Sequence, residues 1–254
     1  MANSVRLIDK AIQRKSPFIV FLKSIFYLCK NYLMEYRNAL EEVRVSLSRL
    51  DTGSPLSQER TEALENGLYG CVLVAEEDLR EQLRQWEIAS LAREFKGYAL
   101  QLLDAREHLE AVAVATERMI EALSEHPRLS VELLELRLQA LRHLSEESPE
   151  QQEVIEEVEQ ELTYYRENIA LADKGSLQKI HQRGFLKHDP VEWSARWEEV
   201  IDQVDEKVDA LLADHPRGMG FCYAFWSARQ ETLHKEFGIA WRSPAQMNRG
   251  VIFD

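Results

Sequence analysis

Glycine and proline are scarce in this chain. Its 254 residues include ten glycines and seven prolines. Both residues interrupt regular secondary structure, so their scarcity argues against a turn-rich fold and favours long helices with few connections. No segment alternates apolar and polar residues as a half-buried strand does, and "GVIFD" at the end is too short to found a sheet. We therefore predict an all-α protein.

Cysteine is scarce as well. The three cysteines, Cys29, Cys71 and Cys222, are widely spaced and form no CxxC pair. An odd, dispersed set favours neither a disulfide framework nor a structural zinc site. Reduced thiols are typical of the cytoplasm, and the N-terminal "MANSVRLIDKAIQRK" lacks the apolar core and cleavage site of a signal peptide. We expect a cytoplasmic protein.

Standard catalytic fingerprints are missing too. The chain contains no GxSxG, GxxxxGK[ST] or HExxH, and "GMGFCY" supplies only the first two glycines of GxGxxG. Di-iron helical bundles need two Glu-x-x-His pairs, and only one such pair occurs here, Glu231 and His234. We expect no metal and no cofactor. An enzyme remains an open alternative rather than the favoured class.

The chain has no long uninterrupted apolar run. The most apolar stretch, residues 17–34, is broken by Lys23, Lys30 and Asn31 and is too short and polar to span a bilayer. It is typical of a buried core helix, so we expect Phe18, Phe21, Leu22, Ile25 and Phe26 to be buried. An integral membrane protein is therefore not expected, and attachment of residues 17–44 to a membrane surface is the weaker alternative.

Positive charge is in deficit, with a net charge of −13. This balance argues against nucleic-acid binding, which needs a basic footprint. A local exception is a stripe of cations spaced seven residues apart: Lys23, Lys30, Arg37 and Arg44. On a helix this spacing keeps the charges on one slowly drifting face. The stripe is either the solvated edge of a core helix facing acidic neighbours or a docking face for an anionic partner or membrane surface.

Helical signals cover almost the whole chain. We predict helices over residues 4–14, 17–50, 58–94, 98–126, 130–145, 148–172, 189–213 and 220–237, and a single turn at "SPAQ". Capping patterns support several starts, including "SPEQ" at 148–151 and "DPVE" at 189–192. Gly67 and Gly70 indicate a close helix crossing or a kink, and Gly97 a break. The expected architecture is an elongated bundle of seven to nine helices, which could be built from stacked antiparallel pairs.

Composition changes near residue 175. Residues 175–254 hold six of the ten glycines, four of the five tryptophans and four of the seven histidines. We predict a helical body over 1–174 and an aromatic, glycine-rich portion over 175–254 packed on it in one continuous domain. Its last segment, 238–254, is too apolar to stay in water, so we expect it to dock on the helical body. The alternative is a plug for a groove of a partner.

The stretch "HPRGMGF", 215–221, opens an aromatic helix with two glycines. Backbone N–H groups at a helix start, with glycines that permit close approach, suit an anion. The candidate anion or ligand site comprises His215, Arg217, Gly218, Gly220, Glu231 and His234. The alternative is that the two glycines let the helix start tightly against a neighbour, with Phe221, Phe225 and Trp226 filling the core.

Two function classes follow. The first is a helical binding or scaffolding protein that contacts an unidentified protein partner, and conceivably a second copy of itself, through the basic stripe or the C-terminal aromatic region including Trp241. The second is a small-anion or small-ligand protein, conceivably an enzyme. A deep pocket lined by His215, Arg217, Glu231 and His234 would favour the second class.

Overall fold

The computed structural model describes residues 35–53, 56–144 and 149–253. Within these ranges it contains nine α-helices and no strand, and 75% of the residues are helical. The predicted all-α class and helix number are confirmed. The predicted core positions in 17–34, and with them Lys23 and Lys30, lie outside the described residues.

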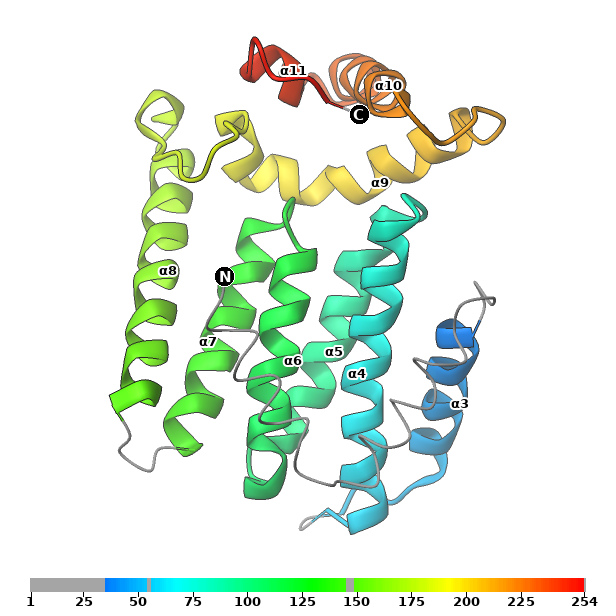
Figure 1. The fold of residues 1–254 in the computed structure, drawn as a ribbon, viewed down its shortest axis with the longest axis vertical. Coiled ribbons are helices and arrows are strands. Elements are labelled where there is room, and N and C mark those ends of the chain that lie inside the picture. Colours follow the sequence, from blue (N-terminus) through cyan, green and yellow to red (C-terminus); the bar gives the residue numbers. More distant parts are fainter. Residues whose placement is uncertain (1–34, 54–55, 145–148, 254) are drawn as a thin grey trace.

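Six helices lie side by side in a bundle (Figure 1). They are α3 (Glu35–Arg49), α4 (Gln58–Arg80), α5 (Ile88–Leu102), α6 (Leu109–Ala122), α7 (Pro127–Leu144) and α8 (Pro149–Asp173). Each helix packs on the next along the chain, and α4 also packs on α6 and α5 on α7. The pair α4–α5 therefore stacks on the pair α6–α7, which is the arrangement of antiparallel pairs that the sequence allowed.

A C-terminal layer covers one end of this bundle. Helix α9 (Ala195–Leu211) runs crosswise over the bundle end, and α10 (Phe221–Phe237) and α11 (Pro244–Met247) lie on its outer side (Figure 1). Four short 3₁₀ helices complete the elements: η1 (Gln85–Glu87), η2 (Arg106–His108), η3 (Leu177–Lys179) and η4 (Pro190–Trp193). As predicted, the helix after residue 193 packs beside the helix after residue 220.

Three predicted helices are interrupted. The helix predicted over 58–94 ends at Arg80, because Gln82 (φ 53°) and Arg84 (φ 42°) adopt the left-handed conformation before η1 and α5. The helix predicted over 98–126 ends at Leu102 and restarts through η2. The helix predicted over 189–213 divides at Ser194. The first two break segments, residues 81–87 and 103–108, contain neither glycine nor proline, so tertiary packing sets these breaks.

Two glycine predictions have opposite outcomes. The break predicted at Gly97 is wrong, because this residue lies inside α5. The close crossing predicted from Gly67 and Gly70 is confirmed: a Cβ at Gly67 would lie 2.8 Å from the Tyr98 ring, and one at Gly70 3.0 Å from Leu40 Cδ1. These glycines let α5 and α3 approach the backbone of α4.

The buried apolar side chains form two separate cores. The first lies within the bundle and runs from Leu40 to Leu162, and the second lies in the C-terminal layer and runs from Trp197 to Trp241. The two sets share no residue. In the described ranges, no helix has both the length and the apolar character that crossing a bilayer requires.

Candidate functional site

The C-terminal layer is positioned by local capping. Asp189 accepts a hydrogen bond from Val191 N (3.1 Å) and starts η4, and Ser194 accepts one from Trp197 N (3.2 Å) and starts α9. Helix α10 ends at Gly238, whose φ of 68° requires glycine or strain. The Ile239 N–H then donates to Leu233 O (3.0 Å). This turn directs the chain back along α10.

The returning segment 239–242 is extended, with alternate side chains buried. Ile239 and Trp241 belong to the second core, whereas Ala240 and Arg242 are exposed. The indole of Trp241, 2% exposed, lies 5.9 Å from that of Trp197 and donates to Glu192 Oε1 (2.7 Å). These contacts fix the segment on the layer that it follows in sequence.

Asp189 also holds this segment. Its Oδ2 accepts hydrogen bonds from the backbone N and the Nε of Arg242, both at 2.8 Å. Farther on, the Asn248 amide exchanges two hydrogen bonds with the backbone of Lys187, each at 2.8 Å. The returning chain is thus fastened at Arg242 and again at Asn248 to the stretch that leads into η4.

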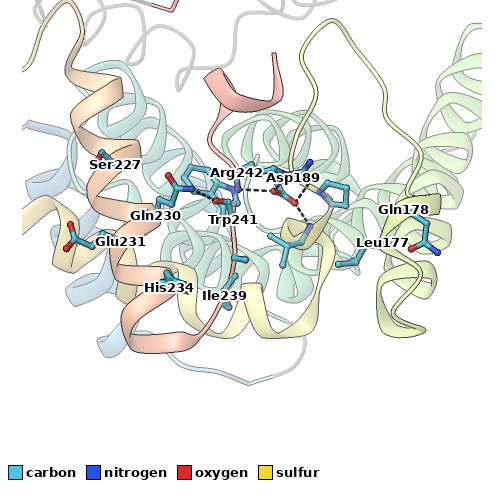
Figure 2. A pocket seen from close by; sticks show the side chains of 13 residues that line it. Leu177, Gln178, Asp189, Ser227, Gln230, Glu231, His234, Ile239, Trp241 and Arg242 are labelled. Carbon is cyan, nitrogen blue, oxygen red and sulfur yellow. Dashed lines mark hydrogen bonds and ion pairs between the residues drawn. The ribbon is translucent and has the colours of Figure 1, made fainter. Parts of the chain in front are cut away.

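A groove of about 930 Å³ lies along the returning segment, between α10 and the η3–η4 region. Figure 2 shows Ser227, Gln230, Glu231 and His234 along the α10 wall, with Leu177 and Gln178 on the opposite side. The remaining lining residues are Asp189, Pro190, Val191, Ile239, Ala240, Trp241 and Arg242. The groove therefore has a mainly apolar floor and polar walls.

The residues predicted as an anion site are not brought together. Glu231 and His234 line the groove, whereas His215, Arg217, Gly218 and Gly220 do not. The two sets lie near opposite ends of α10, whose 17 residues span about 25 Å. Glu231 is itself ion-paired with Lys235.

Arg217 is engaged within the protein. Its guanidinium pairs with Asp209, donates to the carbonyl oxygen of Gln82, and lies 4.9 Å from the Phe221 ring centroid. His215 is exposed in the preceding turn. Gly220 has a φ of 82°, and no atom lies within 4 Å of a Cβ built at it. This glycine therefore supplies a left-handed conformation, and neither it nor Gly218 makes the close packing contact that the sequence left open.

The described part of the basic stripe faces the acidic side chains of neighbouring elements. Arg37 pairs with Asp78 and Glu87, and Arg44 donates to both carboxylate oxygens of Glu94, at 2.8 and 2.6 Å. Burial raises the pKa of Glu94, but the hydrogen bonds from Arg44 and Tyr98 outweigh it and lower the pKa overall. Arg37 and Arg44 thus join α3 to its neighbours.

A buried charge cluster under the groove is absent from the sequence-based set of site residues. Arg229, 3% exposed, donates to both oxygens of Asp205 (2.8 and 2.5 Å) and to Glu125 Oε1 (2.6 Å). Its guanidinium lies 4.8 Å from the ring centroid of Phe225 and 5.5 Å from that of Trp241. Arg229 therefore connects the groove floor to the bundle.

The tryptophans of this region divide among three environments. Trp197 and Trp241 belong to the second core, whereas Trp193 packs edge-on against Tyr164 and Tyr165 of α8. Trp226 packs against the second core from outside and lies 5.1 Å from Phe253. Trp197 and Trp241 lie against each other with their ring planes tilted by 36°.

Both cysteines in the described ranges, Cys71 and Cys222, are free of disulfides. Among the described residues, no three His, Cys, Asp or Glu side chains are grouped to hold a metal ion. Burial raises the pKa of the Cys71 thiol, which keeps it protonated.

Fold and groove together define an all-helical protein with an open, mixed-polarity groove at one end. No protein-family model matches this chain, and neither the curated proteins nor the solved structures contain a match.

Proposed function

We propose that the protein is a cytoplasmic helical binding protein that acts through protein–protein interaction. The groove beside residues 239–242 would receive an extended segment of the partner. The observation that carries this proposal is the groove itself, about 930 Å³ in volume, open along an extended stretch of the chain. Grooves with an apolar floor and a few polar groups are the usual form of a binding site.

The lining chemistry suits a peptide. Gln178 and Ser227 on opposite walls offer hydrogen-bond donors and acceptors for a peptide backbone. Leu177 and Ile239 offer apolar contact area for its side chains. The Arg242 side chain is 58% exposed although Asp189 accepts from its Nε and, at 3.5 Å, from Nη2, so N–H groups on the outer side of the guanidinium remain for a carboxylate. The favoured partner segment is extended and carries an acidic residue beside apolar ones.

The alternative sites have less support. Arg37 and Arg44 have intramolecular carboxylate partners, so an anionic partner would have to displace them. Small-anion binding near His215 would similarly compete with Asp209 for Arg217. We therefore favour peptide binding in the groove over the anion-binding alternative.

Peptide selection against the full chain tests this proposal. Random peptides of about ten residues would be selected on the wild-type protein and their dissociation constants measured. Ala240→Arg places a long side chain in the groove from an exposed position, so it should weaken binding at least tenfold. That factor corresponds to about 1.4 kcal/mol.

Leu100→Arg is the matched control. Leu100 is 50% exposed on α5 and does not line the groove, so binding should be unchanged. Peptides that bind wild type and Ala240→Arg equally well would refute the groove as the binding surface. Selection of no acidic residue would refute the role given to Arg242.

A further inference from the structure

One corner of the chain carries several of the polar contacts between the C-terminal layer and the bundle. This corner, residues 123–129, connects α6 to α7 beneath α9, which crosses the bundle end (Figure 1). The Trp197 Nε1–H donates to the carbonyl oxygen of Glu125 (3.1 Å). Arg229 of α10 reaches the Glu125 side chain as well. Both elements of the layer therefore hold the same residue.

The start of α7 is capped by a side chain of α9. The Glu198 carboxylate accepts hydrogen bonds from Arg128 N and Leu129 N, each at 3.1 Å. The first N–H groups of a helix have no partner within it, and a carboxylate there also meets the positive end of the helix dipole. Helix α7 thus depends on α9 for its N-terminal cap.

His126 lies between two carboxylates at this corner. Its ring is 5% exposed, with Nε2 3.0 Å from Asp202 Oδ1 and Nδ1 3.7 Å from Glu198 Oε1. One further cation lies nearby: Arg93 of α5 is 3.8 Å from Asp202. A positive imidazolium therefore bridges two negative groups of α9.

The remaining charges around His126 are committed to other partners. Glu125, its neighbour in the chain, pairs with Arg229 of α10. Arg128, two residues later, pairs with Asp173 of α8. The two arginines of these pairs, Arg229 and Arg128, are thus held by carboxylates other than Asp202 and Glu198.

We propose that this corner is a protonation-dependent latch, from which α9, α10 and the returning segment separate when His126 loses its positive charge. The buried apolar residues of the bundle and of the layer form separate clusters, because the two cores share no residue. The hydrogen bonds and ion pairs across the corner can be exchanged for water at lower net cost than buried apolar area. A neutral imidazole keeps the N–H toward Asp202 but turns a lone pair toward Glu198, so the attraction to one of the two α9 carboxylates becomes a repulsion and the charge attraction to the other is lost.

The protonation of His126 determines whether the latch weakens as the pH rises or as it falls. Burial lowers the pKa of His126, but Asp202 and Glu198 outweigh it and raise the pKa to about 9 from 6.5. A raised folded-state pKa means that the stabilisation is complete below about pH 6.5 and is lost as the pH rises through about 9. The latch should therefore weaken between these values.

Two optical signals distinguish the layer from the bundle. Four of the five tryptophans lie in residues 175–254, so tryptophan fluorescence reports mainly on the layer, whereas far-UV circular dichroism reports mainly on the bundle helices. Thermal unfolding of the full chain is followed by both signals. We expect coincident transitions at pH 6 and, at pH 9.5, a fluorescence transition about 5 °C or more below the dichroism transition. Coincident transitions at pH 9.5 would overturn the proposal.

Substitutions assign the effect to His126. His126→Gln keeps a neutral donor and should separate the two transitions already at pH 6, with little further change at pH 9.5. His108→Gln is the control, because His108 pairs with Glu65 within the bundle and should leave the wild-type behaviour intact. If His126→Gln does not fold, Asp202→Asn provides the test. In that variant the fluorescence and dichroism transitions should begin to separate at a lower pH than in wild type. A wild-type pH profile in either variant would overturn the latch.

Discussion

At the scale of single residues, arginine has two roles in this protein. On the exposed face of α9, Arg196 forms an i,i+3 pair with Glu199, and both side chains are more than half exposed. Beneath the groove, Arg229 is buried against Asp205 and Glu125. Exposed pairs contribute little to stability, whereas removing one partner of a buried pair leaves an uncompensated charge.

This contrast gives a direct comparison of two substitutions. Arg229→Met leaves the buried Asp205 and the Glu125 carboxylate without their cation, and should lower the free energy of unfolding by about 3–5 kcal/mol. Arg196→Met should change it by less than about 0.5 kcal/mol. Chemical denaturation of both variants measures the difference. Equal effects would show that the charge cluster beneath the groove is not a structural centre.

At the scale of helices, several start signals were predictable from sequence and interruptions were not. The helix predicted to start at residue 130 starts at Pro127, and the start at Ser194 was not predicted. Ser57, Asp189 and Ser243 accept capping hydrogen bonds, because their side chains need only backbone groups two or three residues away. The break at Gln82 has no such local signal. Its carbonyl oxygen is instead held by Arg217, 135 residues away.

The candidate site also contains both residues that local sequence reveals and residues whose roles depend on distant partners. The extended tail residue Trp241 could be selected from composition alone. Arg229 could not be assigned a buried role, since its partners Asp205 and Glu125 lie 24 and 104 residues away. Single-sequence patterns report local geometry, whereas charge pairing across elements depends on the completed fold.

Two glycines of the helical bundle make this point testable. Gly67→Ala places a Cβ 2.8 Å from the Tyr98 ring and should destabilise the protein by about 1–3 kcal/mol, as overpacking does. Gly97→Ala meets no atom within 4 Å in the middle of α5, and should stabilise by up to about 1 kcal/mol. Midpoints of urea unfolding provide the measurement. Effects of the same sign would contradict the close crossing of α4 and α5.

At the scale of the whole molecule, the protein combines a self-contained bundle with a smaller layer whose core is partly built from the returning segment. Ile239 and Trp241 supply two of the ten buried apolar residues in that second core. The loop before η4 fastens the segment through Asp189 and Lys187. Removing the segment should therefore affect the layer far more than the bundle.

Two truncations separate the contribution of this segment from that of the chain end. Deleting residues 239–254 removes Trp241, whose loss alone costs about 3–5 kcal/mol for a buried aromatic, so the fluorescence transition should fall by about 10 °C. The exposed core should also bind a hydrophobic dye. Deleting only 250–254 keeps Trp241 and the Asn248–Lys187 hydrogen bonds. It removes Ile252, which is 86% exposed, and the contact of Phe253 with Trp226 outside the second core, so its transition should fall by no more than about 5 °C. If the long deletion melts like the parent and binds no dye, the segment is not part of the core. The plug interpretation would then replace it, with the peptide 239–254 as the bait for its partner.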